Sequence, residues 1–255
     1  MAWMYGGEYC ILITTLPCLS LSDSVDVGIV NGTEAKPHSR PYMVSVQTSE
    51  GHKCGGFLVS KRFVMTAAHC WNKKLIFTAV LGAHDLKDRK ERSITMQVKN
   101  YHVHPKYLDN NSFDYDILLL ELQGTVKKSR NVKWISIPRK PEDIKADSRC
   151  SIACWGQKGT YKGLSSRLLE TQVSIIDQKK CNDLWDKPLS QRMVCAAHPG
   201  GTCWGDSGGP LVCNNTAVGI VFFGDAYTCD NPKKPDVFTK ISELLPWITS
   251  ITTNM

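Results

Sequence analysis

Short apolar runs separated by turn residues recur from residue 42 onward, and this pattern most restricts how the chain can fold. Runs such as Tyr42–Gln47 and Leu168–Ile176 have the length of β-strands and are rich in β-branched and other apolar residues. Only Ile241–Thr253 has a helical pattern, with Pro246 tolerated near a helix start. Many short strands in series predict an all-β protein built as barrels or a sandwich. The other expected strands are Gly56–Ser60, Phe77–Leu81, Ile94–Val98, Asp116–Leu122, Cys150–Trp155, Leu211–Cys213 and Ala217–Phe223.

The cysteine content indicates an oxidising compartment. The chain has 11 cysteines in 255 residues, and no paired CxxC motif of a zinc site accompanies them. His102 and His104 could share one strand face, but no third ligand stands nearby, so no metal site is expected. We therefore predict a disulfide framework rather than a metal-binding protein.

An apolar run near the N-terminus, Tyr9–Leu21, has the length of a signal peptide and is too short to span a membrane. Small residues favour cleavage after Ser22 or Ser24. We expect residues 1–24 to be a signal peptide, 25–28 a short activation propeptide and 29–255 the mature domain. No later run is apolar enough for a transmembrane helix, so a secreted or granule-stored protein is expected.

The charge is strongly basic. The chain carries a formal net charge of +7, and its first 28 residues contain three acidic and no basic side chains. Residues 29–255 therefore hold 31 basic and 21 acidic residues, a net charge of +10. The basic residues are scattered, and no nucleic-acid-binding motif accompanies them. Two interpretations stay open, a solvated surface and weak binding to a sulfated polysaccharide.

Three separated segments carry a possible catalytic constellation. The segment 205–210, Gly-Asp-Ser-Gly-Gly-Pro, places Ser207 on a glycine-rich turn, His69 lies in Thr-Ala-Ala-His-Cys, and Asp116 precedes Ile-Leu-Leu-Leu. Serine needs a base to become nucleophilic, and histidine is neutral enough near pH 7 to act as one. A carboxylate must orient that histidine, and Asp116 is favoured over Asp114 because a buried strand follows it. The order His, Asp, Ser is one of the known orders of this triad.

These segments, together with Ile29–Gly32 and Glu34–Met43, resemble the chymotrypsin family of serine proteases, and most closely its granzyme and mast-cell protease branch. The resemblance covers residues 29–255. It implies two six-stranded antiparallel β-barrels, at about 29–137 and 138–240, and a C-terminal helix at about 241–253. The implied activity is peptide-bond hydrolysis through an acyl-enzyme, without a cofactor. The implied partners are protein or peptide substrates and serpin-type inhibitors.

The same resemblance assigns further roles. The oxyanion hole would be formed by the N–H groups of Gly205 and Ser207, and a freed Ile29 amine would pair with Asp206. Since no Lys or Arg precedes Ile29, activation by dipeptide removal is expected rather than by tryptic cleavage. The implied disulfides are Cys54–Cys70, Cys150–Cys213, Cys181–Cys195 and Cys203–Cys229. Cys154 is left over, either as a buried inert thiol or as an intermolecular bridge.

The substrate pocket combines a neutral residue and an acidic one. By resemblance Gly201 lies at its base and Asp236 on its wall, with Phe222 in place of the hydroxyl that usually supports the triad aspartate. We expect preference for Lys or Arg before the scissile bond, with some acceptance of large apolar residues. The alternative is an elastase-like pocket in which Asp236 is hidden and small aliphatic residues are preferred. A catalytically impaired relative that binds polyanions or microbes is the other alternative. The remaining pocket residues are Thr202, Trp204, Phe223 and Gly224.

Overall fold

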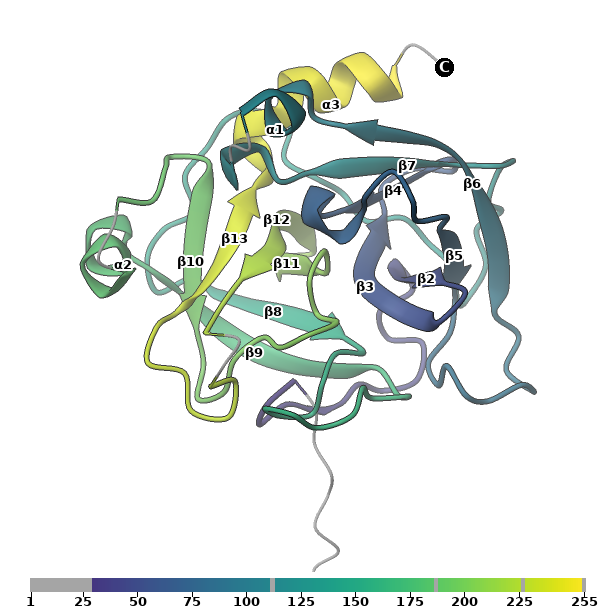
Figure 1. Cartoon of the computed structure of the whole chain (residues 1–255), viewed down its shortest axis with the longest axis horizontal. Coiled ribbons are helices and arrows are strands. Elements are labelled where there is room, and N and C mark those ends of the chain that lie inside the picture. The colour runs from purple at the N-terminus through teal and green to yellow at the C-terminus, as the bar shows by residue number, and fades with distance from the viewer. Residues whose placement is uncertain (1–28, 111–112, 186–187, 226–227, 254–255) are drawn as a thin grey trace, which may run out of the picture.

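The computed structural model describes residues 29–110, 113–185, 188–225 and 228–253. The expected signal peptide and propeptide lie outside the described residues. Within the described ranges, two β-barrels lie side by side, with the earlier strands in one barrel and the later strands in the other (Figure 1). The expected pair of six-stranded antiparallel barrels is confirmed.

The first barrel closes in the strand order β2-β3-β4-β7-β6-β5. Its interior is filled by side chains that alternate with outward-facing residues, and Val44, Phe57 and Leu119 are fully buried there. The strands are β2 (Met43–Thr48), β3 (Gly51–Leu58), β4 (Phe63–Thr66), β5 (Thr78–Leu81), β6 (Ile94–Val103) and β7 (Leu118–Leu122).

The second barrel closes because β8 pairs with both β9 and β11. Its strands follow the order β9-β10-β13-β12-β11-β8. They are β8 (Arg149–Cys154), β9 (Leu169–Ile176), β10 (Met193–Ala197), β11 (Pro210–Cys213), β12 (Thr216–Phe223) and β13 (Asp236–Lys240).

The N-terminal segment joins the second barrel rather than the first. Strand β1 (Thr33–Glu34) pairs antiparallel with β9, and Thr33 faces Glu170. The resemblance had grouped residues from 29 with the N-terminal barrel. The physical reason for the difference is that Ile29 is fully buried in the core of the second barrel.

The expected C-terminal helix is divided in two. A 3₁₀ helix spans Ile241–Leu244 and α3 spans Leu245–Thr252, with Pro246 in the first turn of α3, where its missing N–H is tolerated. Ile241, Leu244 and Ile248 pack into the core of the first barrel, so the C-terminus ties the two barrels together (Figure 1). Two short helices, α1 (Pro105–Asn110) and α2 (Gln178–Trp185), were not predicted from the sequence.

Candidate active site

His69 and Asp116 are brought together by the pairing of β4 with β7. Thr66, at the end of β4, faces Leu118 at the start of β7. His69 follows in a 3₁₀ helix, Ala68–Cys70, and Asp116 stands two residues before β7. Residues 47 positions apart therefore meet at one end of the first barrel.

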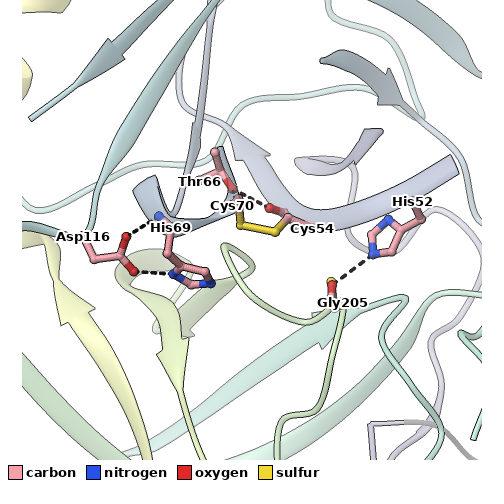
Figure 2. The surroundings of a disulfide bond; sticks show 9 residues. His52, Cys54, Thr66, His69, Cys70, Asp116 and Gly205 are labelled. Carbon is pink, nitrogen blue, oxygen red and sulfur yellow. Dashed lines mark hydrogen bonds and ion pairs between the residues drawn. A yellow bond between two sulfur atoms is a disulfide. The ribbon is translucent and has the colours of Figure 1, made fainter. Parts of the chain in front are cut away.

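The His69–Asp116 contact fixes the imidazole. The His69 ring donates from Nδ1 to Asp116 Oδ2 at 2.7 Å, and the His69 backbone N–H donates to Oδ1 at 2.8 Å (Figure 2). Asp116 is fully buried, whereas the His69 side chain is 30% exposed. Since the carboxylate accepts a hydrogen bond from Nδ1–H, the neutral ring carries its proton on Nδ1, and Nε2 is free to accept a proton.

Ser207 shares a cavity with His69. The cavity has a volume of about 200 Å³. Gly55 N–H donates to the Ser207 carbonyl at 2.8 Å from one flank, and Gly208 N–H donates to the Val221 carbonyl at 2.9 Å on the other. The serine is thus held where the two barrels meet. The lining residues are His69, Thr202, Cys203, Trp204, Ser207, Val221, Phe222, Phe223 and Gly224.

The glycines beside Ser207 are required by geometry. Gly205 and Gly208 have φ of +94° and +81°, a region that other residues rarely adopt. A Cβ on Gly208 would lie 2.1 Å from Thr66 Oγ1 and 2.5 Å from the Gly55 carbonyl oxygen. Only glycine lets this turn approach the first barrel closely enough to place Ser207 beside His69.

The Gly205 carbonyl is held by two donors that the sequence analysis did not assign. His52 Nε2 lies 3.0 Å from this oxygen and Cys154 Sγ lies 3.3 Å from it (Figure 2). Ser45 Oγ lies 2.7 Å from His52 Nδ1 and can donate to it. Burial lowers the pKa of His52 to about 4, so the ring is neutral, and burial also raises the pKa of the Cys154 thiol. Cys154 is an unpaired buried thiol, as one of the two interpretations held.

Asp206 is buried and points toward backbone N–H groups. Its Oδ1 accepts from Gly156 N–H at 3.0 Å and its Oδ2 from Cys203 N–H at 2.9 Å. Burial raises its pKa to about 7, although both N–H groups favour the charged form. A Cβ on Gly156 would lie 2.3 Å from Asp206 Oδ1, so glycine is needed there.

The segment beginning at Ile29 lies near this carboxylate. Ile29 is fully buried, and Val30 packs with Cys203 and Cys229. A Cβ on Gly200 would lie 1.8 Å from the Val30 carbonyl oxygen. Val30 therefore packs against the loop whose Cys203 N–H binds Asp206, while the Ile29 side chain lies in the core of the second barrel.

Asp236 lies behind the cavity wall. It is 3% exposed, and it accepts hydrogen bonds from Thr202 N–H at 3.0 Å and Thr202 Oγ1 at 2.8 Å. The cavity is lined by Thr202 and Gly224, while Asp236 and Gly201 are not among its lining residues. Burial raises the pKa of Asp236 to about 6. His198, whose side chain is buried, places Nε2 3.7 Å from Asp236 Oδ2.

Phe222 packs beside the catalytic candidates instead of donating a hydrogen bond. Its ring centroid lies 6.0 Å from that of His69 and 4.5 Å from that of Phe223. Both described hydrogen bonds to the Asp116 carboxylate come from His69, and Thr239 Oγ1 donates to the Asp116 backbone carbonyl at 3.1 Å. An aromatic ring therefore covers the side of the site where the family has a hydroxyl.

The described part of the chain contains four disulfides, two of them beside the site. Cys54–Cys70 holds β3 beside the 3₁₀ helix that carries His69 (Figure 2), and Cys203–Cys229 joins two segments next to the cavity. Cys150–Cys213 and Cys181–Cys195 brace the second barrel. These pairs are the ones that the family resemblance implies. By the usual scale each contributes about 2–4 kcal/mol, mainly by restricting the unfolded chain.

In the ranges that the structure describes, no group of three or more His, Cys, Asp or Glu side chains could hold a metal ion. Over the same ranges, no helix combines the length and the apolar character needed to cross a bilayer.

Known proteins resemble this chain in both sequence and structure. The family described as Trypsin matches residues 29–248. Granzyme M of Rattus norvegicus is 38% identical over 94% of this chain and 96% of its own, and cathepsin G of Homo sapiens is 36% identical over 86% of each. The structure of neuropsin, a serine protease of mouse brain, superposes with a TM-score of 0.80 at 33% identity, covering 87% of this chain and 99% of its own. The chain belongs to the trypsin family of serine proteases and is a serine endopeptidase.

Proposed function

We propose that Ser207, His69 and Asp116 are the catalytic triad of this endopeptidase. The observation that carries the proposal is the buried Asp116 carboxylate holding the Nδ1 edge of His69, on a cavity that Ser207 also lines. In the first step, Ser207 Oγ attacks the substrate carbonyl carbon while His69 Nε2 takes the hydroxyl proton. His69 then gives that proton to the departing amine, which leaves an acyl-enzyme at Ser207. Water releases the acyl group by the same route in reverse.

The oxyanion formed in each step would be bound by the backbone N–H groups of Gly205 and Ser207. The φ of +94° at Gly205, and the two donors on its carbonyl, support a loop that is fixed before substrate arrives. Such preorganised donors each contribute about 3 kcal/mol to transition-state stabilisation.

Activation is proposed to follow removal of residues before Ile29. The burial of Ile29, and the packing of Val30 against Cys203, support an Ile29 α-ammonium that pairs with Asp206. A buried carboxylate whose partners are N–H dipoles is stabilised by such a cation, and loss of one partner of a buried pair typically costs about 3–5 kcal/mol. The chain is thus a zymogen, trimmed by dipeptide removal and stored in granules or secreted.

For the residue before the scissile bond, we propose an uncharged apolar side chain of small to medium size. The cavity walls include Val221, Phe222 and Phe223, and Thr202 lies between the cavity and Asp236. The position of Thr202 between the cavity and Asp236 supports the elastase-like alternative over the expected preference for Lys or Arg. The hydroxyl and N–H of Thr202 already satisfy the carboxylate, so a substrate cation would have to displace them.

The test uses chain processed to begin at Ile29. A fluorophosphonate should label wild type and fail to label the Ser207→Ala variant, and peptide anilides ending in Val or Leu should be cleaved faster than those ending in Lys. Absence of labelling in the processed protein would contradict the catalytic assignment and favour the impaired, polyanion-binding alternative. Labelling with faster cleavage after Lys would contradict only the apolar preference.

A further inference from the structure

The imidazole of His198 lies beside the buried carboxylate of Asp236, outside the catalytic cavity. His198 stands two residues after Ala196, which pairs with Asp236 in the register of β10 and β13. Its side chain is 1% exposed, and its Nε2 lies 3.7 Å from Asp236 Oδ2. Among the described residues, this nitrogen has no hydrogen-bond partner. Buried polar atoms are nearly always hydrogen-bonded, so this one needs a physical explanation.

The proton of the His198 ring is directed at that carboxylate. Gly200 N–H donates to His198 Nδ1 at 3.1 Å, so Nδ1 is the acceptor of the ring. Burial lowers the pKa of His198 to about 4, so the ring is neutral near pH 7 and carries its one proton on Nε2. A separation of 3.7 Å is too long for a full hydrogen bond. The Nε2–H group therefore acts on Asp236 as a dipole whose positive end faces a buried negative charge.

Asp236 stands close to the cavity although it does not line it. Thr202 and Gly224 do line the cavity. Thr202 donates to the Asp236 carboxylate through both its N–H and its hydroxyl. A Cβ on Gly224 would lie 2.1 Å from Asp236 Oδ1. One threonine and one glycine therefore separate the cavity from a carboxylate that, with a pKa of about 6, is ionised near pH 7.

The two oxygens of this carboxylate have different neighbours. Oδ1 lies next to Gly224 and accepts from the Thr202 hydroxyl, and both of these residues line the cavity. Oδ2 is the oxygen that faces His198, which does not line the cavity. A Lys or Arg side chain in the cavity would attract the carboxylate, because hydrogen bonds between charged groups are stronger than neutral ones. The His198 dipole stabilises the carboxylate in its buried position instead.

We propose that His198 is a positioning residue that acts through Asp236 to keep the cavity selective for apolar side chains. The inference rests on the proposed apolar preference and adds a group that maintains it. Without the Nε2–H group, the ionised carboxylate would lose part of its stabilisation, and a substrate ammonium would then bind it more strongly. An apolar substrate side chain makes no such contact, so its cleavage would change little.

The test compares two substrates that differ in one side chain. Processed protein that begins at Ile29 is assayed on p-nitroanilides with the same acyl part, ending in either Val or Lys, after titration of active sites with a fluorophosphonate. His198→Phe keeps a buried ring and removes the donor. It should raise the Lys-to-Val ratio of kcat/KM about fivefold, as expected for loss of one modest polar contact, through a lower KM for the Lys substrate. His198→Gln, whose amide can donate, should keep the ratio within about twofold of wild type.

A second background shows whether the effect passes through Asp236. In Asp236→Asn, the further change His198→Phe should leave the Lys-to-Val ratio unchanged, since the amide carries no charge. His102→Phe is the matched control. Like His198, His102 has a buried Nε2 with no partner among the described residues, and this atom lies 3.6 Å from Oε2 of the buried Glu121. His102 belongs to β6 of the first barrel and does not line the cavity, so its change should leave the ratio as in wild type.

Three results would overturn the role of His198: an unchanged ratio in His198→Phe, an equal rise in His198→Gln, or the same rise in the Asp236→Asn background. If His198→Phe does not fold, long-range ¹⁵N NMR of wild type decides. A proton on Nε2 alone supports the proposal, and a proton on Nδ1 overturns it. Faster cleavage after Lys by wild type contradicts the apolar preference, while a further rise in His198→Phe would still support His198. Failure of fluorophosphonate labelling contradicts the catalytic proposal, and the NMR measurement still tests the position of the proton.

Discussion

The carboxylate of Asp206 makes the stability of the unprocessed chain depend on pH in a direction opposite to that of a salt-bridged acid. Burial raises its pKa from an ordinary value of 3.8 to about 7, so between these pH values the folded state binds more protons than the unfolded state. Stability is therefore highest below pH 3.8 for this group and falls as the pH rises toward 7. About three pKa units at 1.36 kcal/mol each correspond to about 4 kcal/mol.

Processing should remove this dependence. A free Ile29 α-ammonium beside Asp206 would favour the ionised form and lower the pKa of the carboxyl group. The decrease in unfolding free energy between pH 4 and pH 8 is then expected in the chain with an intact Gly28–Ile29 bond and not in the chain that begins at Ile29. Asp206→Asn, which cannot titrate, should also lack this contribution in both forms.

The assay is urea unfolding of the disulfide-intact protein at pH 4, 5, 6, 7 and 8, in a Ser207→Ala background that prevents self-cleavage. Other buried groups titrate in the same range, including His52 and Asp236, so the informative quantity is the difference in unfolding free energy between wild type and Asp206→Asn at each pH. In the unprocessed chain this difference should change by about 4 kcal/mol across the series. A difference that stays constant with pH, or one equally steep after processing, refutes the proposed pairing of Ile29 with Asp206.

Three further outcomes are expected. Gly200→Ala should lower the unfolding free energy by about 1–3 kcal/mol and reduce activity of the processed form, because its Cβ would meet the Val30 carbonyl at 1.8 Å; unchanged urea denaturation would contradict this packing. In wild type, stability should fall by about 3 kcal/mol as the pH falls from 6.5 to 4, since burial keeps the folded His52 ring neutral while the unfolded ring gains a proton. His52→Gln should lack this fall. An identical acid transition in both proteins would argue against a buried neutral ring. Phe222→Ser should lower stability by about 3 kcal/mol, because removal of a buried ring outweighs one new hydrogen bond to Asp116; a rise in the melting temperature would show that the hydroxyl matters more than the ring.

The residues proposed as the triad could be singled out because each stands in a short local pattern, whereas the disulfide pairs were implied by the family resemblance and are formed in the structure. The glycines around Ser207 require a turn, and a histidine or an aspartate beside a buried strand can be recognised from neighbouring residues alone. Strands with continuous apolar runs, such as β7, were predicted for the same reason. Four of the described strands were not predicted, and the first of them, β1, has only two residues. Strand β4 has only four residues, β10 contains alanine and cysteine rather than branched side chains, and β13 begins with Asp236 and ends with Lys240.

Strand β13 shows why some strands cannot be predicted without knowledge of tertiary contacts. Asp236 and Lys240 are both buried, at 3% and 6% exposed, because partners from distant segments satisfy them. Thr202 binds the carboxylate, and Asp143 with Glu243 binds the ammonium. A charged side chain at each end of a five-residue run has no local signal for burial, since the cost of burial is offset only after the barrel closes.

The sequence by itself determined which groups we propose for the chemistry, since Ser207, His69 and Asp116 each stand in a local pattern that restricts the backbone. Only the tertiary structure decided how those groups are supported and what they can reach. The donors to the Gly205 carbonyl, the Thr202 cover over Asp236 and the approach of His198 to Asp236 all join segments between 34 and 153 residues apart. Such contacts exist because two closed barrels bring their loops to one cleft, and no periodicity along the chain encodes which loops will meet.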